Sequence, residues 1–236
     1  MDKNETGAAG RQSKVVGARS LVEAAYATIR HDILNGELGP GLKLRFEMLR
    51  ERYGYGASTL REALTRLVGE ALVTSEEQRG FRVAEISLED FADLTRARKL
   101  IEVEALRQSI IFGDDAWEGA LVGAFHRLSK VEEKLGEGSA DLRDDFEARN
   151  RDFHYTLIAA CPSRWLKYMH GILFQQSERY RRISLATRSD QERDVHAEHK
   201  AVLDAALARD VDLACRLEGE DRTSTRLNSS HTDISR

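Results

Sequence analysis

The feature that most constrains the fold is the turn Gly54-Tyr55-Gly56, which stands between two short amphipathic segments. The segment before it, residues 46–53, has helical periodicity. The segment after it repeats leucine at Leu60, Leu64 and Leu67. Residues three and four positions apart lie on one face of a helix, so this segment has one side to bury. Two helices joined by so short a turn predict a helix-turn-helix.

The residues before this pair predict another helix and a short extended segment. Residues 1–18 are polar and rich in glycine and alanine, and we expect them to form a disordered tail. Ser20 and Glu23 form a capping-box pattern, and apolar residues follow at every fourth position until Gly36. Pro40-Gly41 cannot continue a helix, so a turn should lead into the extended segment.

A β-hairpin is expected after the helix-turn-helix. Leu72-Val73-Thr74 and Phe81-Arg82-Val83 are short apolar runs, separated by a polar tip that contains Gly80. Three helices followed by a two-stranded ribbon form a winged helix-turn-helix, which we assign to residues 19–85.

From Ser87 onward the sequence predicts only helices. Ser87 is a capping residue, and the segments after it have a period near 3.6, with interruptions at residues 136–138 and 161–163. The fold class is therefore mostly α: a winged helix-turn-helix with a β-hairpin wing, then an all-α helical bundle of five or six helices over residues 87–220. Residues 221–236 do not continue the last helix, and we interpret them as a non-native tail that resembles a translated sequencing adapter.

Charge and cysteine content limit the class of protein. The net charge is -4, but residues 1–84 carry 13 Lys and Arg against 11 Asp and Glu, so a mildly basic N-terminal part precedes an acidic one. No apolar run is long enough to cross a bilayer, and the N-terminus lacks the apolar centre of a signal peptide. Cys161 and Cys215 have no metal or redox spacing, so we expect both to be reduced and buried in a cytoplasmic protein without a membrane partner.

The helix that starts after Gly56 carries the residue types of a DNA-reading helix. Ser58, Thr59 and Arg61 lie at its start, where hydroxyls, a guanidinium and free backbone N–H groups can meet base edges and phosphates. In the alternative, Thr59 and Glu62 only cap the helix and the arginines are solvated; the helix alone does not decide between the two. The other expected DNA contacts are flanking arginines and the hairpin tip: Arg50, Arg66, Arg79 and Gly80.

The whole ordered set of elements resembles the winged-helix domain of GntR-family transcription regulators. The similarity covers residues 20–84, and its marks are "IRHDILNGELGPGLKL", "LREALTRLVGEALV" and the wing "RGFRV". The resemblance implies that a homodimer binds a double-stranded DNA operator. The family usually has an arginine early in the recognition helix, where this chain has Ala57, so base reading should depend on Ser58, Thr59 and Arg61.

The helical region is similar to the FCD effector domain of the FadR subfamily, through "RARKLIE", "NRDFHYTLIAA" and "EHKAVLDAALARD". This resemblance implies a ligand-responsive regulator, in the form of a repressor released by a small organic acid. Arg98 and Arg179 are the expected effector-binding residues, since a buried guanidinium can hold a carboxylate with two parallel hydrogen bonds. The alternatives are an intrahelical ion pair of Arg98 with Glu102 and a solvated basic face around Arg179.

The same resemblance implies a divalent metal site for Zn, Ni or Mn. In the family an Asp-x-x-x-His pair and two later histidines hold the ion. Here the corresponding residues are Asn150, His154 and His199, while the fourth ligand, expected further along the same helix as His199, is missing. Spacing of four puts Asn150 and His154 on one helical face. The alternative for His154 is a core histidine that is hydrogen-bonded between helices.

The second functional class is a metal-dependent helical-bundle enzyme that carries a winged-helix docking module. Such an enzyme needs a general base or nucleophile near His154 and His199. Asp152 faces away at helical spacing, and the sequence shows no activated serine or cysteine arrangement. The sequence therefore favours a regulator that is not an enzyme.

Overall fold

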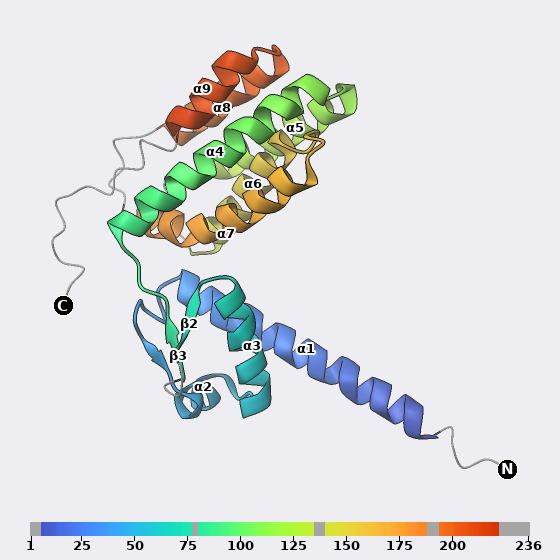
Figure 1. Cartoon of the computed structure of the whole chain (residues 1–236), viewed down its shortest axis with the longest axis vertical. Coiled ribbons are helices and arrows are strands. Elements are labelled where there is room, and N and C mark those ends of the chain that lie inside the picture. The colour runs from blue at the N-terminus through green and yellow to red at the C-terminus, as the bar shows by residue number, and fades with distance from the viewer. Residues whose placement is uncertain (1–5, 77–79, 135–139, 188–193, 222–236) are drawn as a thin grey trace. The chain divides into compact units, whose positions relative to one another are not determined.

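A computed structural model of the chain describes residues 6–76, 80–134, 140–187 and 194–221 (Figure 1). The chain divides into two compact units, Met1–Ile86 and Ser87–Arg236. The first unit combines helices with a small sheet, and the described residues of the second form helices and their connections. The fold is therefore mostly α, as the sequence predicts.

The N-terminal unit is the expected winged helix-turn-helix. Its helices are α1 (Thr6–Leu34), α2 (Phe46–Tyr53) and α3 (Ala57–Gly69), and its strands are β1 (Lys43–Leu44), β2 (Val73–Glu76) and β3 (Gly80–Val83). The strands form an antiparallel sheet in the order β1-β3-β2. Strands β2 and β3 are the predicted hairpin, and β1 is the predicted extended segment.

One apolar core holds the winged helix together. Leu60, Leu64 and Leu67 of α3 are fully buried, as their spacing predicts, and they pack with Ile29 and Ile33 of α1. Burial of each such side chain stabilises the fold by about 1.5–3 kcal/mol. This packing fixes α3 by one face and leaves its opposite face at the surface.

The start of the first helix differs from the prediction. Helix α1 begins at Thr6, so residues 6–18, expected to form a disordered tail, continue the helix, and Ser20 does not cap it. Lengthening an existing helix needs no new nucleus, and each added residue gains a backbone hydrogen bond. The segment has no proline, and its glycines lower helix propensity without ending the helix.

The described residues of the second unit form six helices: α4 (Leu88–Phe112), α5 (Asp115–Glu132), α6 (Ala140–Leu157), α7 (Arg164–Thr187), α8 (Val195–Leu207) and α9 (Val211–Asp221). Ser87 caps α4, and its hydroxyl accepts a hydrogen bond from the backbone N–H of Asp90 at 3.0 Å. The helix that carries His199 ends at Leu207, so it does not continue to the expected position of the fourth metal ligand. Arg209 is left-handed, with φ at 58°, and α9 packs against α8. The expectation of a fourth metal ligand on the same helix as His199 therefore had the wrong geometry.

The helical unit has its own apolar core. Leu106 of α4, Leu121 of α5 and Phe153 of α6 are buried at its centre, and they pack with residues of α8 and α9. Cys161 and Cys215 are buried and free, as expected. Within the described ranges, no helix has the length and apolar character needed to cross a membrane. The interpretation of residues 221–236 as a non-native tail falls, from residue 222 on, outside the described residues.

Candidate DNA-reading surface and buried polar cluster

The start of α3 offers unpaired backbone donors. Gly54 is left-handed, with φ at 75°, and Gly56 is extended, which turns the chain from α2 into α3. The N-cap Gly56 has no side chain to bond, and no side chain caps α3. The alternative in which Thr59 and Glu62 form the cap is therefore not supported. The N–H groups of the first turn remain available to an anion such as a DNA phosphate.

The side chains on this turn differ in exposure. Ala57, Ser58 and Arg61 are exposed, and Thr59 is half-buried. The Arg61 guanidinium lies over the ring of Phe46, 5.1 Å from its centroid. This stacking holds the guanidinium beside the start of α2 without consuming its hydrogen-bond donors.

Apart from Arg82, whose Nη1 donates to the Gly41 carbonyl oxygen at 2.6 Å, the arginines and the lysine with described side chains in the winged helix fall into two groups. Arg30, Arg52 and Arg66 each pair with an acid; Arg66 meets Glu23 at 2.6 Å and stacks over Tyr26 at 4.0 Å. Arg66 is thereby held against α1. The exposed residues of the other group form no ion pair within the described part of the chain: Lys43, Arg45, Arg50 and Arg61.

Sequence reasoning selected Arg50 and Arg61 from this second group and did not select Lys43 and Arg45. Arg45 directly precedes Phe46, and the Phe46 ring lies under the Arg61 guanidinium. The backbone of Arg45 is therefore next to the residue on which Arg61 stacks. Gly80 is exposed and left-handed, with φ at 91°, at the first position of β3. Arg79 lies outside the described residues.

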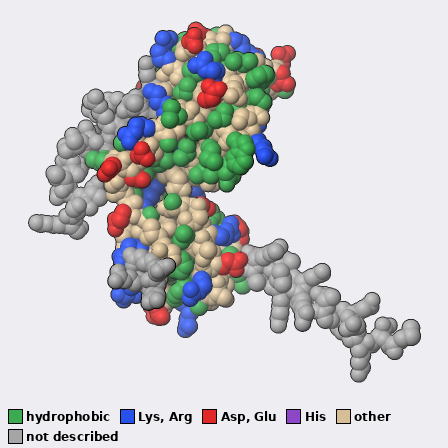
Figure 2. All heavy atoms as spheres, in the orientation of Figure 1, with side chains coloured by type: hydrophobic (Ala, Val, Ile, Leu, Met, Phe, Trp, Pro, Cys, Tyr) green, Lys and Arg blue, Asp and Glu red, His purple; other side chains and the backbone are tan. Residues whose placement is uncertain are grey.

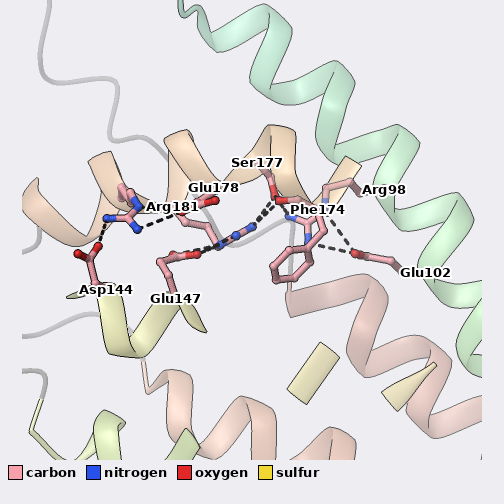
Figure 3. Close-up of polar contacts among 9 residues, drawn as sticks. Arg98, Glu102, Asp144, Glu147, Phe174, Ser177, Glu178 and Arg181 are labelled. Atoms are coloured by element: carbon pink, nitrogen blue, oxygen red, sulfur yellow. Dashed lines mark hydrogen bonds and ion pairs between the residues drawn. The ribbon is translucent and has the colours of Figure 1, made fainter. Parts of the chain in front are cut away.

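The helical unit buries a polar cluster between α4, α6 and α7 (Figure 3). Arg98 of α4 is 6% exposed; its Nη2 lies 3.0 Å from Oε1 of Glu102, and its Nη1 donates to Oγ of Ser177 at 2.5 Å. Oε1 of Glu102 also lies 3.3 Å from Nε2 of His170. Burial lowers the pKa of Arg98 while Glu102 opposes this effect, and a guanidinium stays charged. The intrahelical pair of Arg98 with Glu102, which was the alternative to effector binding, is present, and it is buried.

A second arginine joins this cluster, and it is not the expected Arg179. Arg181 donates to the same Ser177 hydroxyl and pairs with Glu147 of α6 at 2.8 Å. The Phe174 ring contacts both guanidiniums, with centroid distances of 5.0 Å to the first and 4.2 Å to the second. Arg179 is also buried, but it lies two residues before Arg181, and a step of two residues along a helix rotates the side-chain direction by about 200°. The side chain of Arg179 therefore leaves α7 on the side opposite to that of Arg181.

The residues predicted to bind metal lie beside the cluster. The rings of His154 and His199 are 5.3 Å apart, and Asn150 is buried one turn before His154. Nδ1 of His199 is 2.6 Å from Oε1 of Glu132, which leaves Nε2 for another partner. Burial and the nearby His199 and Arg98 lower the pKa of His154 well below its usual range, so this imidazole is neutral.

The donor set decides how a metal could be held here. Among the described residues, no three His, Cys, Asp or Glu side chains form a group suited to a metal ion. The ligand set that the family resemblance implies at this position is the Asn150 amide with His154 and His199. Three protein ligands leave coordination positions open, as in sites that also bind a small molecule.

Two acids near these histidines were not anticipated from the sequence. Glu218 of α9 is buried with Oε1 3.7 Å from Nδ1 of His154, and burial and Glu102 raise its pKa to about 8, against the opposing effect of Arg98. Burial alone would raise the pKa of Glu132, but the hydrogen bonds with His199 and His196 lower it overall. Both acids come from helices distant in sequence, which no local pattern reveals.

The first unit is a winged helix whose α3 begins with an exposed basic residue, and the second is a helical unit with buried arginines. Together they define the class of the protein: a DNA-binding transcription regulator with a second, ligand-binding type of domain. Residues 21–83 match the family described as bacterial regulatory proteins, gntR family, and residues 93–219 match the FCD domain. The chain belongs to the gntR family of bacterial regulatory proteins and carries an FCD domain.

Named relatives agree with this assignment. The chain is 43% identical over 203 residues to the uncharacterized HTH-type transcriptional regulator BphR of Paraburkholderia xenovorans (strain LB400), covering 86% of this chain and 82% of that protein. It is 36% identical over 195 residues to the HTH-type transcriptional repressor GlaR of Escherichia coli (strain K12), covering 81% and 88%. The relatives are named as regulators, and the enzyme alternative has no support.

Solved structures show the same fold. E. coli McbR/YncC matches 86% of this chain and 93% of its own with a TM-score of 0.66 at 20% identity. A putative transcriptional regulator GntR from Rhodococcus sp. RHA1 matches 88% and 100% with a TM-score of 0.64 at 17% identity. At these identities the similarity is one of fold alone.

Proposed function

We propose that this regulator is a repressor that a small organic acid releases from its operator, and that the acid binds at Arg98. The relative GlaR is named as a repressor, which supports the sign of regulation. The observation that carries the proposal is the buried Arg98 guanidinium, which faces other polar side chains from α4 and α7 and stacks on Phe174.

Arg98 has the chemistry to exchange partners. A guanidinium has five N–H donors in a fixed fork, and a carboxylate can accept two of them in parallel. Glu102 engages Nε and Nη2 through a single oxygen, Oε1, and Ser177 accepts from Nη1. An incoming carboxylate would replace these contacts with a two-oxygen pairing. The acid controls DNA binding only to the extent that it binds one arrangement of the protein better than another.

The operator is read by two copies of the winged helix on a two-fold-symmetric DNA site, in the cytoplasm where bacterial DNA lies. Ser58, Thr59 and Arg61 contact base edges and phosphates, with the N–H groups of the first α3 turn on a phosphate. Arg50 and the hairpin tip, Arg79 and Gly80, contact the flanking backbone. We leave Arg66 out of this surface because it is paired with Glu23.

A divalent cation fits beside the acid. Asn150, His154 and His199 would hold it, and the cation would supply a positive charge for a carboxylate that completes its coordination. The neutral state of His154 and the Glu132 bond to His199 suit this role, since ligating imidazoles are neutral and are oriented by a carboxylate. Isothermal titration with zinc and nickel, compared between the wild type and His154→Gln, tests it; equal affinity in both would contradict these ligands.

The effector proposal is tested by operator release in a mobility-shift assay with a panel of small mono- and dicarboxylic acids. An active acid should release the wild type and should fail on Arg98→Met, which keeps the length of the side chain and removes its charge. Arg96→Met is the matched control, since Arg96 is exposed on the same helix and, among the described residues, forms its ion pair with Asp93 at 2.9 Å. Normal release of Arg98→Met would contradict the assignment.

The DNA-reading surface is tested with Arg61→Ala and Arg52→Ala. Each removes one exposed positive charge from the winged helix, but the Arg52 guanidinium is paired with Asp32 of α1 at 2.6 Å. We expect Arg61→Ala to abolish specific operator binding and Arg52→Ala to preserve it. Retained specific binding by Arg61→Ala would refute the role of Arg61.

A further inference from the structure

The Arg61 guanidinium differs in its partners from the other arginines of the winged helix that stack on aromatic rings. Arg52 and Arg66 each lie over a tyrosine ring, and each also pairs with an acid at 2.6 Å. Arg61 lies over the Phe46 ring at 5.1 Å, and its guanidinium forms no ion pair or hydrogen bond within the described part of the chain. A ring attracts a guanidinium through its π face and leaves the five N–H donors unused. The stack therefore holds Arg61 while its donors remain available.

The Phe46 ring is itself held in place by the wing and the core. Phe46 is the first residue of α2, and its ring meets Phe81 of β3 edge-on, with the centroids 6.1 Å apart and the planes at 85°. Phe81 pairs with Leu44 of β1, and both phenylalanines pack against the buried core of the winged helix. The ring under Arg61 is therefore a platform that is fixed to α2, to the sheet and to the core.

The position of Arg61 on α3 suits it to read a base. Arg61 is exposed and lies one turn after Ala57, the first residue of α3, whose side chain has no hydrogen-bonding group. Ser58 and Thr59 each offer a single hydroxyl. Arg61 is thus the side chain of this turn that can make two parallel hydrogen bonds, and guanine presents the matching O6 and N7 acceptors in the major groove. Figure 2 shows basic side chains at several places on the winged helix, among acidic ones, so charge alone does not mark where a base is read.

Ordering the guanidinium before DNA binds should increase discrimination between bases. A side chain as flexible as arginine that becomes ordered only on binding costs roughly 3- to 10-fold in affinity. The stack on Phe46 orders Arg61 in the free protein, so a contact with the correct base avoids most of this loss. Non-specific binding depends on the charge of the phosphates and gains little from such ordering. The ring should therefore affect sequence preference more than total affinity for DNA.

We propose that Phe46 is a positioning residue that holds Arg61 for the recognition of one guanine in each half of the operator. The inference rests on the proposed function, because it takes α3 as the DNA-reading helix. It gives a residue of α2 control over base preference without any contact between that residue and the base.

Selection from a randomised duplex library with the full chain, followed by sequencing of the bound DNA, tests the proposal. The wild type should select half-sites with one guanine that Arg61→Ala no longer prefers. Phe46→Leu keeps an apolar side chain at the start of α2 but removes the ring. It should lower the preference for this guanine roughly 3- to 10-fold and leave the other positions unchanged. Phe46→Tyr restores the ring and should restore the preference.

Met48→Ala is the matched control for loss of packing. Met48 lies on the same helix as Phe46 and packs against the same core, and this change removes as many heavy atoms as Phe46→Leu does. Because it leaves the ring under Arg61 intact, it should keep the guanine preference. Fluorescence anisotropy with a duplex of random sequence checks the fold of each variant. Phe46→Leu should match the wild type in this affinity and in its salt dependence, since no charge is removed.

The possible results separate this inference from the proposed function. Loss of the guanine preference in Arg61→Ala but not in Phe46→Leu would refute the positioning role alone. A stronger guanine preference in Phe46→Leu would also refute it, because the ring would then hold Arg61 away from the bases. Loss of the preference in Met48→Ala would show that packing of the core, and not the ring, is responsible. A guanine preference retained by Arg61→Ala would overturn both this inference and the proposed role of Arg61 in reading the operator.

Discussion

Removing the charge of Arg98 should destabilise the helical unit far more than removing a surface arginine. Arg98 and Glu102 have 8% and 2% exposed side chains and lie 3.0 Å apart. Arg98→Met removes the guanidinium beside the buried Glu102 carboxylate, whose 3.3 Å contact with His170 is longer than the lost contact. Removing one partner of a buried ion pair typically costs about 3–5 kcal/mol, because the remaining charge is desolvated without compensation. With a urea m-value of about 2 kcal/mol per M, the midpoint should fall by roughly 2 M.

The assay can report the helical unit by itself. Both tryptophans of the chain, Trp117 and Trp165, belong to this unit, so urea unfolding followed by tryptophan emission reports on it and not on the winged helix. Protein concentration must be constant across variants, because association shifts apparent stability.

Arg96→Met should cost less than about 0.5 kcal/mol, since its partner Asp93 is exposed. The double variant Arg98→Met/Glu102→Leu should regain much of the loss, because no charge is left unpaired. A cost below about 1 kcal/mol for Arg98→Met would show that water already solvates the pair and would refute the burial argument.

Three further predictions concern single residues. Ser87→Ala removes the α4 cap and should cost about 1 kcal/mol in the same unfolding assay; an unchanged midpoint would mean that water replaces the hydroxyl. Gly113→Ala should cost about 1–3 kcal/mol, because the new Cβ would lie 2.2 Å from the Trp117 ring, whereas Gly119→Ala meets open space and should stabilise α5; equal effects would contradict the packing around Gly113. Burial and Glu70 raise the pKa of Tyr26 to about 12, so its proton stabilises the winged helix below pH 10 and this contribution is lost as pH rises from 10 to 12. An ultraviolet titration of Tyr26→Phe should lose amplitude near the upper end of this range, and a loss near pH 10 would refute the shift.

The sequence predicted what depends on local periodicity. The leucine spacing of α3 and the two short runs of the hairpin each specify one buried face, and the structure confirms both. Two boundaries could not be predicted for physical reasons. Residues 6–18 lack a strong helix signal, but they extend a helix that is already nucleated. The break between α8 and α9 occurs at Arg209, without the glycine or proline that usually marks such a turn.

The buried cluster shows a different limit of sequence reasoning. The α7 residues that reach this cluster are His170, Phe174, Ser177 and Arg181, at steps of four, three and four, and this spacing could have pointed to Arg181 as well as Arg179. The partners of His154 and His199 could not be found this way. Glu218 and Glu132 approach them from α9 and α5, and only tertiary packing brings these helices together.

Charge balance in this cluster links the proposed acid to the proposed cation. Arg98 and Arg181 are already matched by Glu102 and Glu147, so an additional carboxylate would add an uncompensated negative charge at a buried site. A divalent ion at His154 and His199 would add positive charge beside it. The two ligands should therefore bind with positive coupling, and linkage requires each to raise the affinity of the other by the same factor. Titration of an active acid with and without zinc, and of zinc with and without that acid, measures both sides of this cycle. Independent binding would show that the cluster relieves the added charge in another way, for example by releasing Glu102 to solvent.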